Sequence, residues 1–378
     1  MSGAQSDVPS PGLTSFDHTS LGQRVLFGSH RAAENIARAV TDLGAQRVLV
    51  VAGRSSALVA GDVTRALPVV ASIDEVAQHV PAERAAAAVE VAESSGADLV
   101  VTIGGGSATG LGKAVALHTG LPLVAIPTTF AGSEATDVWG ITTDGVKKTG
   151  SDPRVLPRAV VYDAALTLGL PRGSVAVSSL NAVAHGVDGL WAPRADPINR
   201  ALSTEGLRTL VPALQRLAQA GSQDDDEAGG QLALREQLLH GAHLTAVAFA
   251  SAGSGLHHKV CHVLGGAFGL PHAEMHAIVL PHVTAFNAPA APDAAARLAE
   301  LFDGVPAATG LRQLLADLGG PQALRDVGLT ERDLRRAAEL VLPNVPPSNP
   351  RPVDVDALEA LLRAAWAGDP VTEEGADR

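Results

Sequence analysis

The sequence predicts an α/β N-terminal domain with a parallel sheet, followed by an all-helical C-terminal domain. Between residues 24 and 163, short β-branched runs alternate with helical stretches, as in a sheet whose parallel strands are joined by helices. Beyond Asp163 these runs disappear, and Ala and Leu recur every three or four residues, which is typical of helices. The length of 378 residues fits about two domains.

The elements follow one another in a regular order. Strands are expected at residues 24–28, 47–53, 99–106, 121–129 and 159–163. Helices are expected between them at residues 31–43, 82–95 and 107–118. The C-terminal helices are expected at residues 174–191, 197–219, 226–254, 311–318, 331–340 and 355–367. The chain is therefore divided into a disordered tail (1–20), an α/β domain (21–165), a helical domain (166–367) and an acidic tail (368–378).

Composition excludes several kinds of partner. The net charge is −12, from 28 basic and 40 acidic residues, and nucleic acid, which needs clustered cations, is not an expected partner. No run approaches the roughly 18 apolar residues of a membrane span. Residues 1–20 lack the apolar core of a secretory signal, and Cys261 is the single cysteine, so a cytoplasmic protein is expected.

A glycine-rich turn follows the third predicted strand. Gly104, Gly105 and Gly106 precede Ser107, where a helix is expected to begin. Bare backbone amides and a helix N-terminus then face one point, which suits the pyrophosphate of a dinucleotide. The alternative is a tight turn without a ligand, because the spacing is not that of the GxGxxG fingerprint.

Two further segments lie at the carboxyl ends of predicted strands, where ligands gather in α/β sheets. One contains Gly53 and Arg54, and the other contains Thr128, Thr129 and Ser133. These residues are predicted to bind the cofactor. Arg54 stands where a ribose or its 2′-phosphate would be read, which admits NADPH as well as NADH, although an ordinary surface arginine is equally compatible.

Histidines are concentrated in the helical half. Eight of the 13 lie between residues 240 and 282, which indicates a chemical site. His258 and His262 are spaced i, i+4 and so share a helix face, as do Asn181 and His185, while His272 follows a turn. Four other histidines between residues 240 and 282 are expected to have structural roles, namely His240, His243, His276 and His282.

Five segments together resemble the maleylacetate reductases, a branch of the iron-containing alcohol dehydrogenase family, over about residues 24–366. They are IGGGSATGLGKAVAL, IPTTFAGSEATDVWG, VKKTGSDPRVLPRAVVYD, NAVAHGVDGLWAP and LHHKVCHVLGGAFGLPHAEMHAIVLPH. The resemblance implies a Rossmann-like nucleotide-binding domain, a helical catalytic domain and a site in the cleft between them, the dehydroquinate synthase-like fold. It also implies a homodimer.

The resemblance bears on the metal. The family's aspartate and three histidine ligands match Asn181, His185, His258 and His272, so the aspartate has become an amide. An amide is a poor ligand for iron or zinc, and three imidazoles supply no balancing negative charge. These positions are therefore expected to be vestigial and the enzyme metal-independent, as the resemblance to maleylacetate reductases also implies.

The expected reaction is the reduction of 2-maleylacetate, a small dicarboxylate, to 3-oxoadipate by NADH or NADPH in the breakdown of aromatic compounds. Asn181 and Ser133 are expected to bind the substrate. The resemblance implies that a lysine contacts the nicotinamide ribose, and Lys147 is preferred, with Lys148 as the alternative if the register differs. Lys113, on the glycine-turn helix, is expected to be a surface charge. The expected catalytic residues are His258, His262, His185, His272 and Lys259.

Three alternatives remain open from the sequence. One is a metal-dependent alcohol or polyol dehydrogenase of the same family, in which Asn181 still binds the metal. Another is a reductase of a different unsaturated keto acid. The last is a lyase related to dehydroquinate synthase, which the lack of a basic phosphate-binding patch in the helical domain disfavours.

Overall fold

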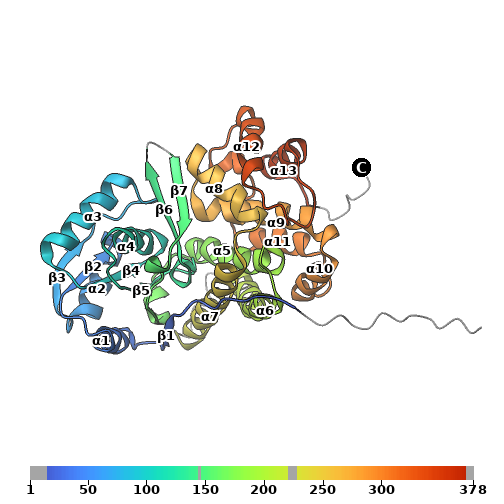
Figure 1. Ribbon diagram of the computed structural model, residues 1–378. Coiled ribbons are helices and arrows are strands. Elements are labelled where there is room, and N and C mark those ends of the chain that lie inside the picture. The colour runs from blue at the N-terminus through green and yellow to red at the C-terminus, as the bar shows by residue number, and fades with distance from the viewer. Residues whose placement is uncertain (1–14, 144–145, 220–227, 372–378) are drawn as a thin grey trace, which may run out of the picture.

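The N-terminal half is built on a six-stranded parallel sheet, which confirms the predicted fold class (Figure 1). The computed structural model describes residues 15–143, 146–219 and 228–371. The strand order is β1-β8-β5-β4-β2-β3, and every neighbouring pair is parallel. The strands are β1 (Arg24–Phe27), β2 (Val48–Ala52), β3 (Val69–Ile73), β4 (Leu99–Gly104), β5 (Leu123–Pro127) and β8 (Ala159–Tyr162).

Helices cover both faces of this sheet because its strands are apolar on both sides. In β2, Val48 and Val50 belong to the apolar core beneath α1 (Ala32–Asp42) and α2 (Ala57–Thr64). Leu49 and Val51, on the opposite face, pack with α3 (Ala82–Ser95) and α4 (Gly106–Thr119). The carboxyl ends of the strands are left uncovered by these helices, and the loops that follow them can line a site.

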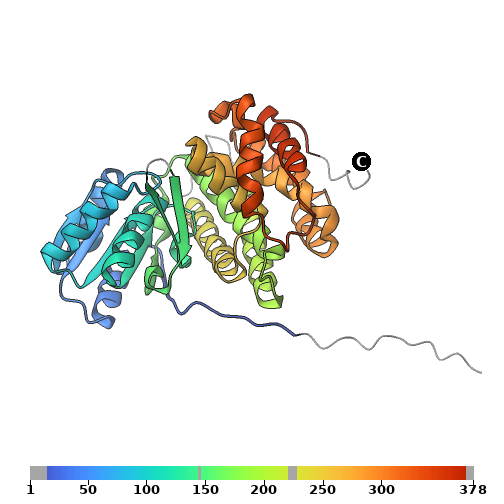
Figure 2. The same cartoon turned by 45° about the horizontal axis from the view of Figure 1, so that its top comes forward.

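Three strands were not expected from the sequence. The edge strand β3 is short and largely exposed, although its sequence, VVASI, is rich in β-branched residues. In the antiparallel hairpin, β6 (Val138–Thr143) is rich in strand-forming residues but interrupted by glycine, whereas β7 (Val146–Ser151) is polar and lacks the usual strand signal. Figure 2 shows that this hairpin stands at the junction between the sheet and the helical half.

The C-terminal half is helical throughout its described residues, as predicted. Two apolar cores hold it together, one centred on α5, α6 and α7 and the other on α8, α9, α12 and α13. The helices are α5 (Arg172–Trp191), α6 (Pro197–Gln219), α7 (Ala228–Ala252), α8 (Leu256–Phe268), α9 (His272–Asn287), α10 (Pro292–Ala299), α11 (Ala307–Asp317), α12 (Leu334–Val341) and α13 (Val355–Ala367). No helix in the described ranges is both long and apolar enough to cross a membrane.

The segment before β1 lies against the helical half. Residues 15–20, which the sequence assigned to a disordered tail, are placed, and His18 Nδ1 lies 2.7 Å from Asp196 Oδ2 just before α6. Gln23 then donates to the carbonyl oxygens of Glu134 and Pro157. In Figure 1 this dark-blue segment passes α7 and α6 on its way to β1, so it connects the two halves.

Candidate functional site

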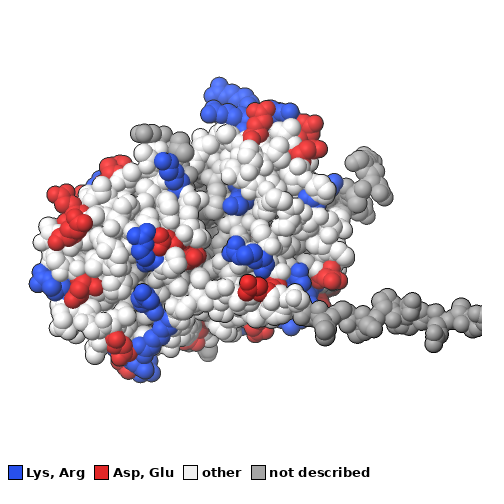
Figure 3. Space-filling view, viewed as in Figure 1, with Lys and Arg blue, Asp and Glu red and all other residues white. Residues whose placement is uncertain are grey.

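A cavity of about 1030 Å³ opens between the sheet and the helices. Its walls combine the loops after β2, β4 and β5 with side chains of α5, α8 and α9. Basic and acidic side chains are interspersed on the face shown in Figure 3, without a basic strip. Most of the predicted site residues line this cavity, namely Gly53, Arg54, Gly104, Gly105, Gly106, Ser107, Thr129, Ser133, Asn181, His185, His258, His262 and His272.

The glycine turn has the backbone geometry of an anion cradle. Gly104 has φ 147°, which disfavours other residues. A Cβ on Gly105 would lie 2.9 Å from Thr129 Cγ2, so glycine alone lets the turn approach the loop after β5. The helix α4 begins at Gly106, and its unpaired amides face the cavity.

The loop after β5 is held from below by Lys113, which is buried, so its expected role as a surface charge is wrong. Its Nζ lies 2.7 Å from the Ser133 carbonyl oxygen and 2.8 Å from those of Thr136 and Val138. Burial lowers the pKa of Lys113 to about 7, and the charges of Glu134 and Asp137 oppose this shift. The three carbonyl oxygens favour the charged form of Lys113, because each can accept a hydrogen bond from one of the three protons of an ammonium group. Lys113 thus fixes the loop that carries Ser133.

Arg54 lies on the rim of the cavity and is exposed. Its Nε is 3.7 Å from Asp74 Oδ2, just beyond β3. A carboxylate near a bound ribose accepts from its hydroxyls, whereas an arginine accommodates a 2′-phosphate. The rim of the cavity therefore presents a carboxylate suited to the ribose of NADH and an arginine suited to the 2′-phosphate of NADPH.

Six histidines assemble beneath the other end of the cavity. They come from α5, α8 and α9, and their ring centroids form a chain of contacts of 4.3–6.1 Å. The rings of His185 and His258 stack at 4.9 Å and 13°. The full set is His185, His257, His258, His262, His272 and His276.

Burial keeps the inner imidazoles neutral. It lowers the pKa of His185 to about 3 and that of His257 to about 4. It also lowers the pKa values of His258 and His276 well below their ordinary value, and neighbouring histidines add to the shift. A neutral imidazole offers one donor and one acceptor nitrogen, so these rings can donate, accept or bind a metal.

Asp188 on α5 fixes the ring of His258. Its Oδ2 accepts from His258 Nδ1 at 2.8 Å and from the amides of Gly255 and His258 at 3.1 and 3.3 Å. Asp188 is fully buried, and burial raises its pKa to about 7. Because Nδ1 donates to Asp188, the acceptor nitrogen of His258 is Nε2, which has no hydrogen-bond partner among the described residues.

Three predicted residues are not brought to the cavity. Thr128 lies in the loop, and its amide donates to the Gly104 carbonyl, but it is not part of the lining. Lys259 is on α8 and lies outside the lining. The backbone of Lys147 pairs with Thr142 in the hairpin, and its side chain falls outside the described part of the structure.

Sequence reasoning missed three residues of the histidine cluster. His276 was expected to be structural, His257 was not considered apart from its neighbour, and Asp188 was not considered at all. A signal for Asp188 was present, because Asn181, His185 and Asp188 are spaced i, i+4, i+7 and so lie along one face of α5.

Two family models match the chain. Residues 22–164 match the iron-containing alcohol dehydrogenase model, and residues 175–366 match the C-terminal model of the Fe-containing alcohol dehydrogenase family. A maleylacetate reductase from Pseudomonas knackmussii is 44% identical over 94% of this chain and 99% of the relative.

Solved structures of the same family are also similar to this chain. The maleylacetate reductase from Rhizobium sp. strain MTP-10005 is 40% identical, with a TM-score of 0.86 over 95% of this chain and all of the other. An iron-containing alcohol dehydrogenase from Corynebacterium glutamicum is 45% identical, with a TM-score of 0.88 over 95% of this chain and 99% of the other.

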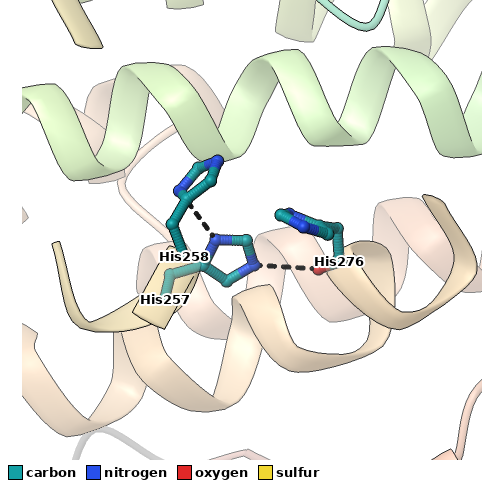
Figure 4. Close-up of side chains that lie close together, drawn as sticks. All are labelled: His257, His258 and His276. Atoms are coloured by element: carbon teal, nitrogen blue, oxygen red, sulfur yellow. Dashed lines mark hydrogen bonds between the residues drawn. The ribbon is translucent and has the colours of Figure 1, made fainter. Parts of the chain in front are cut away.

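The expectation of a metal-independent enzyme is wrong. The matching family models are those of iron-containing enzymes, and His257, His258 and His276 form a buried group that could hold an ion. Their candidate ligand nitrogens lie within 4.8 Å of one another (Figure 4). The rings are neutral, and both nitrogens of His276 lack a hydrogen-bond partner in the described structure, so the residues present fit a divalent cation.

Replacement of Gly105 by alanine is expected to weaken dinucleotide binding about tenfold or more, because the new Cβ would push the turn away from Thr129. Fluorescence titration with NADH measures this. Gly61→Ala on α2 is the matched control, since its Cβ would meet nothing within 4 Å. Equal affinity of the two variants would refute the role of the turn.

The buried lysine predicts a pH dependence of stability. If the pKa of Lys113 is about 7 when folded and near 10.5 when unfolded, the unfolded chain binds the extra proton between these values. The free energy of unfolding of wild type, relative to Lys113→Met, then rises by about 1 kcal/mol per pH unit from pH 7 toward 10. Urea unfolding at several pH values measures it. A flat difference would mean that the three carbonyls keep the ammonium charged.

Proposed function

The chain belongs to the iron-containing alcohol dehydrogenase family, and on that basis we propose that it reduces the carbon–carbon double bond of 2-maleylacetate to give 3-oxoadipate. The enzyme is an oxidoreductase, and NADH or NADPH is the proposed reductant. The observation that carries the proposal is the single cavity joining a glycine cradle at one end to a cluster of neutral histidines at the other. The named relatives support the choice of substrate.

The reaction needs a proton donor and a partner for negative charge. The reduced nicotinamide supplies a hydride to the carbon β to the ketone. The electrons of the double bond move toward the ketone, so negative charge collects on its oxygen, and a proton then reaches the α-carbon. Hydrogen-bond donors placed at that oxygen lower the barrier most effectively in a site that excludes water.

At the cofactor end of the cavity, backbone amides are proposed to bind the pyrophosphate of the dinucleotide. The amides of Gly105 and Gly106 and the Ser107 hydroxyl are proposed to hold the pyrophosphate at the start of α4. Ser133 lies on the loop fixed by Lys113, between the glycine turn and the histidines. Its hydroxyl is buried and has no hydrogen-bond partner within the described residues, so it can serve the cofactor or the substrate.

The histidine end binds the substrate and returns the proton. His262 and His272 line the cavity and are only partly buried, so they can exchange protons with water. We propose His262 as the proton donor to the α-carbon. His185 and Asn181 lie deeper in the same wall and are proposed to position the ketone and a carboxylate.

The proposed function includes a metal. Iron held by the imidazole nitrogens of His257, His258 and His276 would supply positive charge beside the cavity, where the enolate oxygen forms. Of these residues, His258 also lines the cavity and so lies between the substrate and the other two rings.

We also propose a cytoplasmic homodimer. The edge strand β1 leaves Val25 and Phe27 exposed, which suits pairing with a second copy. The single cysteine, Cys261, is buried and free, which is compatible with a reducing compartment. Light scattering of the purified protein tests the dimer.

The direct test is loss of nicotinamide absorbance with freshly prepared maleylacetate, compared with simple alcohols and diols in the oxidative direction. His262→Ala is expected to lower kcat about 100-fold with little change in NADH affinity, because the proton donor is lost. His240→Ala, an exposed residue of α7, is the control. Oxidation of alcohols without reduction of maleylacetate would contradict the proposed substrate, and full turnover in His262→Ala would contradict the proton donor.

Arg54 allows a test of cofactor choice. Arg54→Ala is expected to raise KM for NADPH about tenfold while KM for NADH changes less than about twofold, because only NADPH has a 2′-phosphate. Steady-state kinetics with each cofactor measure the two values. An equal effect on both would show that Arg54 does not contact the 2′ position.

A further inference from the structure

A buried carboxylate beside the cavity has no part in the steps proposed above. Glu134 follows Ser133 in the loop after β5, is 2% exposed and lies outside the cavity lining. We infer that Glu134, Tyr162 and His243 form a hydrogen-bonded chain that positions the Ser133 hydroxyl for the dinucleotide and ties it to α7. The inference deepens the proposed function, because it rests on the dinucleotide binding proposed there.

The Ser133 hydroxyl lies beside the glycine turn. A Cβ built on Gly106, where α4 begins, would be 3.9 Å from Ser133 Oγ. This oxygen is buried and has no hydrogen-bond partner among the described residues. A buried hydroxyl without a partner is costly, and a phosphate or ribose oxygen held at the glycine turn would supply the missing acceptor. The position of Ser133 therefore favours the dinucleotide over the substrate as its partner.

Tyr162 of β8 joins Glu134 to His243 of α7. The Tyr162 hydroxyl donates to Glu134 Oε1 at 2.8 Å, and its oxygen lies 3.2 Å from His243 Nδ1. A phenol has a single proton, which the bond to Glu134 uses, so His243 Nδ1 carries a proton and donates to the Tyr162 oxygen. The chain of hydrogen bonds therefore runs in one direction, from the imidazole through the phenol to the carboxylate.

The negative charge of Glu134 depends on these donors. Burial raises the pKa of Glu134, whereas its own backbone amide, the Tyr162 hydroxyl and the charge of Lys113 lower that pKa. A hydrogen bond to an ionised acceptor is about twice as strong as one between neutral groups. Loss of the Tyr162 hydroxyl would leave a buried carboxylate short of a donor, and movement of the loop would relieve that cost. Ser133, the preceding residue, would move with it.

The loop that carries Ser133 is also packed directly on α7. Gly132 has φ 74°, and a Cβ there would lie 2.8 Å from Ala246 Cβ, so glycine is needed for this approach. His243 lies three residues before Ala246 and therefore on the same face of α7. The hydrogen-bonded chain and the close contact thus join one loop to one helix face, and together they fix the Ser133 hydroxyl relative to the helical half.

A double-mutant cycle tests the chain through the NADH affinity of the full-length protein, measured by fluorescence titration. Ser133→Ala is expected to weaken NADH binding about tenfold, and Tyr162→Phe about fivefold, because the ring keeps its packing but loses the donor. In the Ser133→Ala background, Tyr162→Phe should change the affinity less than about 1.5-fold, since the hydroxyl that it positions is gone. Thr64→Val is the matched control, because it removes a buried hydroxyl that donates to the Ala60 carbonyl oxygen within α2.

Two variants of His243 separate positioning from packing. His243→Asn keeps an N–H donor near the place of Nδ1 and is expected to bind NADH within about twofold of wild type. His243→Phe keeps an aromatic ring against Tyr162, where the two ring centroids are now 5.5 Å apart, but removes the donor. It should weaken NADH binding about threefold. Circular dichroism and thermal unfolding check that each variant folds.

A fivefold loss in Tyr162→Phe that persists in the Ser133→Ala background would show that Tyr162 acts on the fold as a whole, and it would overturn the inference. Unchanged NADH affinity in Ser133→Ala, in Tyr162→Phe or in His243→Phe would overturn it too, as would equal losses in the two His243 variants. Maleylacetate reduction is measured in a separate assay. A wild type that shows the coupling but leaves maleylacetate unreduced would contradict the proposed substrate alone.

Discussion

The site depends on the burial of uncharged imidazoles in a low-dielectric wall. In water a histidine is partly protonated near neutral pH, whereas here loss of hydration drives the inner rings to their neutral form. Neutral rings can lie 4.3–5.0 Å apart without mutual repulsion, which six imidazolium ions could not do. Dense packing of donors and acceptors, and any metal binding, follow from that condition.

The fold supplies this wall by joining two different surfaces. The carboxyl ends of the parallel strands deliver backbone amides at the glycine turn, and the helical half delivers imidazoles from α5, α8 and α9. The loop after β5 couples them. Lys113 holds its carbonyls from the sheet side, and Asn181 Nδ2 donates to Ala131 from the helical side. A shift of either half would therefore be transmitted to Ser133.

The sequence predicted features that depend on local periodicity. The helices at 82–95, 197–219 and 355–367 have the expected bounds because their apolar spacing and terminal residues are clear. The β6–β7 hairpin was missed because β7 is polar and the two strands pair with each other rather than with the main sheet. Lys113 was misjudged because the rule that lysines are exposed cannot anticipate a helix covered on both sides.

The site residues that the sequence predicted are likewise those that local periodicity defines. His258 and His262, and Asn181 and His185, were identified because i, i+4 spacing places residues on one helix face. His257 and His276 were not, since their meeting depends on how α8 packs on α9. A sequence pattern describes one helix at a time. It does not describe which faces of two helices meet.

The error about the metal came from comparing ligands position by position. The amide at position 181 was taken as the loss of the only carboxylate, but α5 carries another at Asp188, seven residues later. Seven residues are about two turns, or about 10 Å, so Asp188 lies on the same face as Asn181 and His185, one step deeper into the protein. There it meets His258 from the side opposite the cavity. Because an imidazole has two nitrogens on opposite edges, one histidine can contact an inner carboxylate and the cavity at once, and His258 does so with Asp188 on one side and the cavity on the other.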